Sequence, residues 1–168
     1  MLLLVLLLAA GAGGLAQEQA APLPEGYAGS ESCALCHERV AGIFRRDPHF
    51  SLDTGGRGAG RRQEWKGRAC EACHGPGKKH SDAGDSLQIF YFGGSIRNPA
   101  PAPADQVNQR CLSCHAGEQT HNGKLFGSHN RNLISCTQCH TVHQAFRRPL
   151  LAREPNAICQ ECHLGVRA

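Results

Sequence analysis

The chain is short of the side chains that usually fill a protein core. Its 168 residues include six Phe, two Tyr and one Trp, and many of its leucines fall within the first ten positions. After those positions, no helical or alternating apolar pattern is sustained for long. Such a chain buries too little apolar surface to offset the entropy lost on folding. A conventional hydrophobic core is therefore excluded, and a bound group must supply the missing apolar mass.

Long apolar runs are also scarce. The one long run covers residues 2–10, and small residues follow it up to Ala16. This run falls short of the roughly 20 residues that a membrane span needs, and its form is typical of a secretory signal cleaved after Ala16. We therefore expect a signal peptide over residues 1–16 and an exported protein over residues 17–168. An uncleaved N-terminal anchor is the alternative.

No cysteine lies outside a repeated pattern. Five copies of Cys-x-x-Cys-His, called motifs 1 to 5 below, begin at residues 33, 70, 111, 136 and 159. This pattern is the attachment signature of c-type haem: two thiols about one helical turn apart bond to the two vinyl groups of one haem, and the next His ligates the iron. The predicted attachment residues are Cys33, Cys36, Cys70, Cys73, Cys111, Cys114, Cys136, Cys139, Cys159 and Cys162. The predicted proximal iron ligands are His37, His74, His115, His140 and His163.

Five covalently attached haem c groups would supply the apolar mass that the side chains lack. We therefore expect the haem-free chain to be largely unfolded. Zinc ribbons and five disulfides are the alternative uses of ten cysteines in an exported chain. Neither alternative explains a His after every pair.

Methionine is absent after Met1, which would be lost with the signal. The iron of a c-type haem can take Met as its second axial ligand, and Met ligation raises the redox potential. Five histidines remain outside the motifs, one for each iron, so bis-His ligation of all five haems is the simplest solution. Potentials below those of His/Met cytochromes follow. The predicted distal ligands are His49, His80, His121, His129 and His143.

Spacing constrains these distal histidines unequally. His143 lies three residues after the His of motif 4, and His80 lies six residues after that of motif 2. Neither reaches easily around the porphyrin of its own motif, so we expect each to bind a neighbouring haem. His49 and His129 stand in segments long enough to wrap around a ring, whereas His121 lies in a polar stretch where a surface role is the alternative. The pairing of distal His with iron stays open.

The motifs recur without a fixed period, which argues against a regular solenoid. We predict a mainly α fold with much irregular loop and almost no β-structure, organised by five stacked haems. Short helices are expected to carry the motifs, for example over Ser32–Phe44 and Ser135–His140. The aromatic run Ile89–Phe92 is expected to pack against a haem face rather than to form a strand.

Two segments are predicted to be connectors. Gly55–Gly60 is rich in glycine and predicts a flexible loop, and Asn98–Ala104 alternates with proline and predicts an extended segment. A two-haem lobe and a three-haem lobe would then be joined near residues 97–106.

Residues 70–80 have the form Cys-x-x-Cys-His-Gly-Pro-Gly-x-x-His, and residues 136–143 have the form Cys-x-x-Cys-His-x-x-His. With motif 3 and Ser128–His129 between them, this series resembles one pentahaem half of the decahaem periplasmic and outer-membrane conduit cytochromes of metal and sulfoxide respiration. It is also similar to the pentahaem donor of periplasmic nitrite reductase. The resemblance covers roughly residues 30–163. It implies low-spin bis-His haems in a nearly linear chain and a location in the periplasm or at the outer membrane.

The formal net charge of +4 does not indicate nucleic-acid binding. Each haem adds two propionates, so five haems could reverse the sign. Arg and Lys are concentrated between Arg39 and Lys79. They either pair with propionates or form a docking face for an acidic redox partner.

The resulting hypothesis is an electron-transfer protein rather than an enzyme, because six-coordinate irons leave no position for a small-molecule substrate. The resemblance implies redox partners: a membrane quinol-oxidising cytochrome, a terminal reductase or a porin–cytochrome conduit. The alternative is a multihaem reductase of nitrite or a similar small oxyanion, which needs one open axial site, as would arise if His121 is not a ligand. A filament subunit of an extracellular wire is a further alternative. The electron donor, the acceptor and the oligomeric state stay open.

Overall fold

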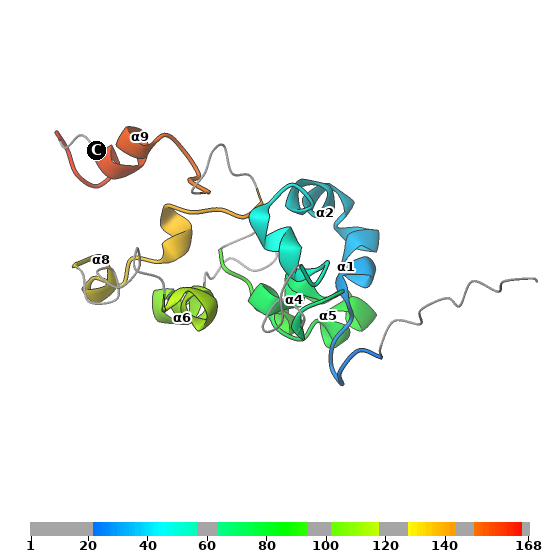
Figure 1. Cartoon of the computed structure of the whole chain (residues 1–168). Coiled ribbons are helices and arrows are strands. Elements are labelled where there is room, and N and C mark those ends of the chain that lie inside the picture. Colours follow the sequence, from blue (N-terminus) through cyan, green and yellow to red (C-terminus); the bar gives the residue numbers. More distant parts are fainter. Residues whose placement is uncertain (1–21, 57–63, 94–101, 118–127, 144–149, 166–168) are drawn as a thin grey trace, which may run out of the picture.

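The computed structural model describes residues 22–56, 64–93, 102–117, 128–143 and 150–165 (Figure 1). The α-helices in these ranges are α1 (Ser30–Cys36), α2 (Glu38–Phe44), α4 (Ala69–His74), α5 (Lys78–Ala83), α6 (Ala104–His115), α8 (Ser128–Arg131) and α9 (Pro155–Gln160). The 3-10 helices are η1 (Pro48–Leu52), η2 (Ser86–Gln88) and η3 (Cys136–Gln138). The same ranges contain no strand, and one isolated antiparallel bridge joins His140 to Leu151. The prediction of a mainly α fold with almost no β-structure is therefore confirmed.

Every Cys-x-x-Cys-His motif lies in a short helix or continues from one. Motif 2 falls wholly within α4, motif 3 forms the end of α6, and both cysteines of motif 1 lie in α1. Motif 4 begins in η3, and motif 5 begins in α9. Helical winding places residues three apart on the same face. The two thiols of a motif are thereby turned toward one side, as attachment to a single haem requires.

The Gly-Pro-Gly segment after motif 2 makes the turn that brings His80 back over the N-terminal helices. Gly75 ends α4 with φ 76°, a left-handed conformation that glycine adopts without steric cost. Gly77 then precedes α5, the helix that carries His80. The sequence after motif 2 thus ends one helix and immediately begins another in a new direction.

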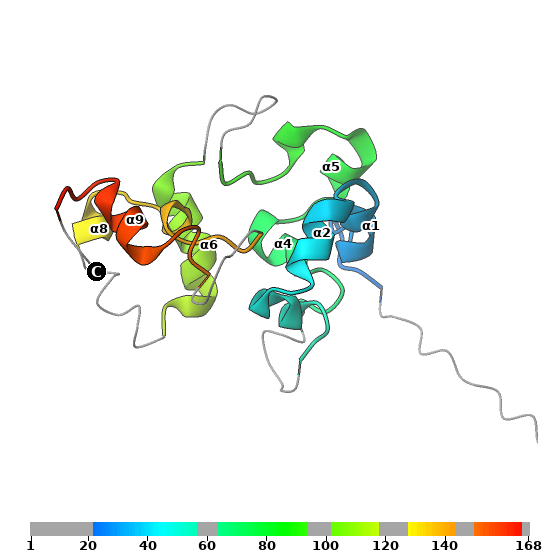
Figure 2. The same cartoon turned by 90° about the horizontal axis from the view of Figure 1, so that it is seen from above.

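The helices gather in two groups in both views (Figures 1 and 2). In the first group α1 packs on α2 and on α4, and η1 packs on α4. In the second group α6 packs on η3, with α8 and α9 nearby. Residues 97–101 of the predicted connector near residues 97–106 lie outside the described residues, and the division into a two-haem and a three-haem lobe stays a prediction.

Little of the described chain is buried. Counted as whole residues, the buried apolar residues in the described ranges are Ala69, Val107 and Ile158, and the buried polar residues are Glu71 and Asn108. Asn108 accepts a hydrogen bond from the Cys136 N–H at 2.8 Å and donates one to the Ile134 carbonyl at 3.2 Å. This small core agrees with the expectation that side chains alone cannot hold the fold together.

The aromatic run after α5 lies against motif 2. Phe92 packs edge-on to the His74 ring, with centroids 5.2 Å apart, and the Phe90 carbonyl lies 2.9 Å from His74 Nδ1. The run forms no strand. Its contacts are with a predicted proximal histidine, and packing against a haem face stays a prediction.

Several predicted features fall outside the described residues: the signal peptide over residues 1–16, the last residues of the Gly55–Gly60 loop, and His121. Among the helices that are described, none has the length and apolarity that crossing a membrane requires.

Candidate functional site

The structure brings predicted distal histidines close to predicted proximal ones from other parts of the chain. Four such pairs lie in the described ranges, with ring centroids 5.9–6.1 Å apart. The pairs are His37 with His80, His74 with His143, His115 with His49, and His163 with His129. Each pair contains the His of one motif and one His from outside the motifs.

The spacing within each pair matches the width of one six-coordinate metal. A bond from a metal to an imidazole nitrogen is about 2 Å long, and the ring centroid lies about 1 Å behind that nitrogen. Two imidazoles on opposite sides of one iron therefore have centroids roughly 6 Å apart. The residues of all four pairs fit a haem iron held between them.

The rings of the four pairs differ in their relative orientation. His74 and His143 are nearly parallel, with an interplanar angle of 12°, whereas His49 and His115 are nearly perpendicular at 81°. Within the described ranges no three His, Cys, Asp or Glu side chains form a cluster suited to a bare metal ion. The histidines come together as pairs instead.

All four of these predicted distal histidines lie beside a motif other than the one that precedes them in the chain. His80 follows motif 2 but faces the His37 ring of motif 1, and His143 follows motif 4 but faces the His74 ring of motif 2. His49, between motifs 1 and 2, reaches motif 3, and His129 reaches motif 5. The distal residues therefore tie together segments that are remote in sequence.

Hydrogen bonds orient several of these imidazoles. The Nδ1 atom of His80 lies 2.9 Å from the Asp85 carbonyl, and that of His74 lies 2.9 Å from the Phe90 carbonyl. A carbonyl only accepts, so in both rings Nδ1 carries the hydrogen and Nε2 is left with a free lone pair for a metal. His49 differs, because its Nδ1 lies 2.8 Å from the Asp47 carboxylate.

Burial favours the neutral form of the best-shielded pair. Desolvation lowers the pKa of His74, despite an opposing hydrogen bond from its ring to the Phe90 carbonyl, and burial likewise lowers the pKa of His143. Neutral imidazole is the form that ligates a metal. At neutral pH both histidines of this pair therefore favour the neutral form, which can bind an iron.

All ten cysteines lie in the described ranges and are free of disulfides. Cys33 of motif 1 shares a hydrogen bond with Cys70 of motif 2, which raises the pKa of the Cys33 thiol and lowers that of Cys70 to about 7. A hydrogen bond with Cys136 of motif 4 similarly raises the pKa of Cys111 in motif 3. Motif 1 thus lies beside motif 2, and motif 3 lies beside motif 4.

Motifs 2 and 3 are also neighbours. Burial raises the pKa of the Cys73 thiol to about 11, and the nearby Cys114 of motif 3 adds to the effect. A cavity of about 520 Å³ opens between α4 and α6, with Trp65, Phe90 and Arg110 in its wall. This volume is within the range of about 300–1,000 Å³ typical of cofactor sites. The Arg110 guanidinium lies 4.6 Å from the centre of the Phe90 ring and provides a positive charge suited to a haem propionate.

Two buried acidic residues at this site escaped the sequence reasoning. Asp47 precedes Pro48 and His49, and an Asp before a Pro is a helix-start signal that could have been noticed. Glu71 occupies one of the two variable positions of motif 2, and nothing in the sequence marks it as buried. Both side chains contact backbone near a predicted distal ligand.

Recurrent Cys-x-x-Cys-His motifs on short helices, with histidines paired at the width of one iron, define a multihaem c-type cytochrome. Comparison with known families agrees with this class. The family model described as "Cytochrome c-type protein NrfB-like" matches residues 70–162, which is more than half of the chain. The chain belongs to this family of c-type cytochromes. The matched range contains motifs 2 to 4 and both cysteines of motif 5.

One curated relative carries a longer chain. The multiheme cytochrome MtrA of Shewanella baltica (strain OS185) is 30% identical over 145 residues, which cover 83% of this chain and 39% of that protein. The chain therefore spans well under half the length of this relative. No solved structure matches the chain.

Proposed function

We propose that this protein carries electrons between redox partners through five covalently attached haem c groups, here numbered 1 to 5 after their motifs. The observation that carries the proposal is the set of four imidazole pairs with centroids 5.9–6.1 Å apart. A haem with an imidazole on each face is six-coordinate, and it exchanges electrons without binding a substrate. When bound, the haems supply the redox chemistry, and the protein supplies ligands, spacing and charge.

The order of the motifs in space supports a continuous path for electrons. The sulfur contacts place motif 1 beside motif 2 and motif 3 beside motif 4, and Cys73 lies close to Cys114 between them. Backbone hydrogen bonds from Thr141 to Leu150 and from Ala152 to Cys139 hold the segment before motif 5 against motif 4. We infer that electrons pass along the haems in the order of the chain.

We choose the distal ligand of haem 4 by counting the predicted ligands. His121 is the remaining predicted distal ligand, and it lies outside the described residues. We assign His121 to haem 4, which completes bis-His ligation and leaves no iron open to a substrate. An open position on haem 4 would instead favour the alternative function, reduction of nitrite or a similar small oxyanion.

The partners are proposed as classes. A membrane quinol-oxidising cytochrome, a terminal reductase or a porin–cytochrome conduit would exchange electrons with an exported carrier in the periplasm or at the outer membrane. The relative named MtrA is a multiheme cytochrome, and this chain covers only 39% of it. We propose a carrier that serves one of these partners in anaerobic or extracellular respiration.

Carbon monoxide binding tests the ligand set, because it occurs only at a ferrous haem with an open or weakly held position. We expect the secreted protein to contain five haems by intact mass and to bind no carbon monoxide when reduced. The variants His80→Ala and His121→Ala should each bind it at one haem in five. The matched control Lys79→Ala changes the exposed neighbour of His80 and should bind none. Fewer than five haems, or binding by the unaltered protein, would overturn the proposal.

A further inference from the structure

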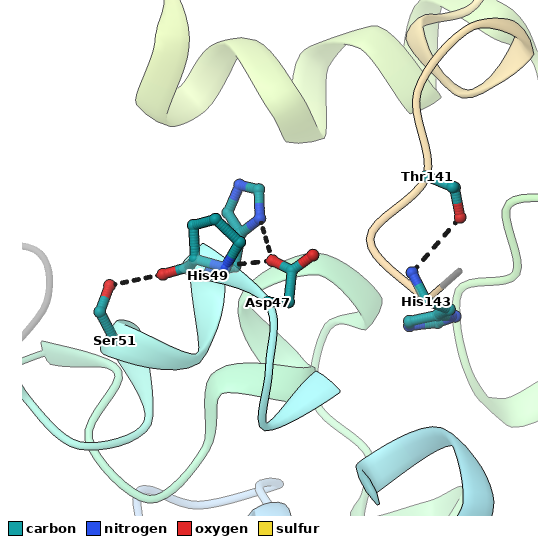
Figure 3. Close-up of polar contacts among 6 residues, drawn as sticks. Asp47, His49, Ser51, Thr141 and His143 are labelled. Carbon is teal, nitrogen blue, oxygen red and sulfur yellow. Dashed lines mark hydrogen bonds and ion pairs between the residues drawn. The ribbon is translucent and has the colours of Figure 1, made fainter. Parts of the chain in front are cut away.

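A buried carboxylate contacts the proposed distal ligand of one haem, and its charge reaches that of another. Only 4% of the Asp47 side chain is exposed, and its Oδ1 atom lies 2.8 Å from His49 Nδ1. His49 belongs to the pair on motif 3. Figure 3 shows the Asp47 carboxylate between the His49 ring and His143, which belongs to the pair on motif 2. Asp47 was not among the residues that the sequence singled out.

The backbone holds this carboxylate in place. Asp47 is the N-cap of η1, and Oδ1 also accepts a hydrogen bond from the His49 N–H at 2.8 Å. Pro48 begins the helix, and Ser51 Oγ donates to the Pro48 carbonyl at 2.8 Å (Figure 3). The capping bond and the bond to the imidazole share one oxygen. The side chain therefore cannot turn away from His49 without also losing the cap.

The charge of Asp47 also reaches Cys73 of motif 2 and the histidine paired with that motif. It opposes the effect of burial on the pKa of His143, and it raises the pKa of the Cys73 thiol. The positive charge of Arg110, which lies in the wall of the cavity, has the opposite effect: it acts to lower the pKa of Cys73 and of His74. Within the described ranges, the side-chain partner of the Asp47 carboxylate is the His49 ring.

A ferric haem carries one more positive charge than a ferrous haem. A nearby negative charge therefore stabilises the ferric state, and the effect is large where water is excluded. A carboxylate that accepts the Nδ1 hydrogen also makes the imidazole a stronger donor to the metal. Both effects lower the reduction potential. The Nδ1 atoms of His80 and His74 face neutral backbone carbonyls instead.

We propose that Asp47 is a positioning residue that lowers the potential of haem 3 strongly and of haem 2 more weakly, and so shapes the potential profile in the middle of the electron path. The inference depends on the ligand pairs of the proposed function. Asp47 touches the distal ligand of haem 3 directly and reaches that of haem 2 only through space. Haem 1 has no such contact, because its distal ligand His80 bonds to a backbone carbonyl.

The test is a potentiometric titration of the five-haem protein carrying Asp47→Asn. Asparagine is a good N-cap and can keep the bond to the His49 N–H, so the main change is the loss of charge. We expect two of the five potentials to rise, haem 3 more than haem 2. The nearly perpendicular His49 and His115 rings (81°) give haem 3 a ferric electron paramagnetic resonance signal distinct from those of the parallel pairs, which identifies the haem that moves.

Asp105→Asn is a matched control. Asp105 is an exposed acid in the first turn of α6, the helix whose last residues form motif 3. Water screens the charge of an exposed carboxylate. Loss of this charge should therefore leave the potentials close to those of the unaltered protein. Asp47→Glu, which keeps the charge, should shift them less than Asp47→Asn.

The outcomes separate the two proposals. Unchanged potentials in an Asp47→Asn protein with five haems and no carbon monoxide binding would overturn the inference and leave the proposed function standing. Carbon monoxide binding that appears only in this variant would show that Asp47 holds His49 on the iron, and would overturn the tuning role. An unaltered protein that binds carbon monoxide or lacks a haem would refute the proposed function itself.

Discussion

Glu71 provides the sharpest test of how the chain positions its ligands. Its side chain is 1% exposed, and it accepts three backbone hydrogen bonds. Oε1 accepts from Ala28 at 2.9 Å and from Gly77 at 2.7 Å, and Oε2 accepts from Gly29 at 3.0 Å. Motif 2 is thereby connected to the start of α1 and to the turn before α5.

These two segments lead to His37 and His80, the proposed ligand pair of haem 1. The fit around Glu71 is tight, since a Cβ atom placed on Gly77 would lie 3.2 Å from Oε1. Loss of the Glu71 bonds should therefore loosen both the helix that precedes His37 and the turn that leads to His80. The perturbation we choose is Glu71→Gln, which keeps the volume of the side chain.

Glutamine replaces one acceptor oxygen with an NH₂ group, so one N–H, that of Gly29 in the present geometry, is left without a partner. A buried unpaired N–H costs about 1–3 kcal/mol, and each bond that loses a charged acceptor weakens by about 1 kcal/mol. The lower cost of burying a neutral amide offsets part of this loss. We expect the free energy of unfolding to fall by about 2–4 kcal/mol.

Guanidinium titration of the five-haem protein, followed at the haem absorption band, measures this change. The control is Glu31→Gln, an exposed acid in the first turn of α1, which should cost less than about 1 kcal/mol. Carbon monoxide binding by a fraction of haem 1 in the Glu71→Gln protein is also expected, because His80 is less firmly held. The Glu71→Gln protein could instead be as stable as the Glu31→Gln control and bind no carbon monoxide. That result would refute the claim that Glu71 holds the turn before α5 in place.

Two further predictions concern the core and the haems. Asn108→Ala should lower the free energy of unfolding by about 1–3 kcal/mol, because the buried N–H of Cys136 and the carbonyl of Ile134 lose their partner. Asn132→Ala is the control, since its bond to the Ser128 carbonyl is exposed; equal stability of the two variants in denaturant titration would contradict the prediction. Replacement of all ten cysteines by Ala should leave a largely unfolded chain, and a cooperative thermal transition by circular dichroism would show that the side chains suffice without haem.

The sequence by itself determined the class of the protein, because haem attachment is a local matter. Two cysteines and a histidine within five residues make one attachment site whatever the rest of the chain does. The small size of the hydrophobic core could also be predicted, because it follows from composition. The scarcity of β-structure could be predicted as well. Spacing alone indicated that His80 and His143 do not serve their own motifs.

Only the tertiary structure decided which histidines meet. His49 faces His115, and His143 faces His74, across long stretches of chain whose path no local pattern specifies. The roles of Asp47 and Glu71 were hidden for the same reason. A carboxylate is recognised as buried, and as the partner of a ligand or of three backbone N–H groups, only when the segments that surround it have been brought together in space.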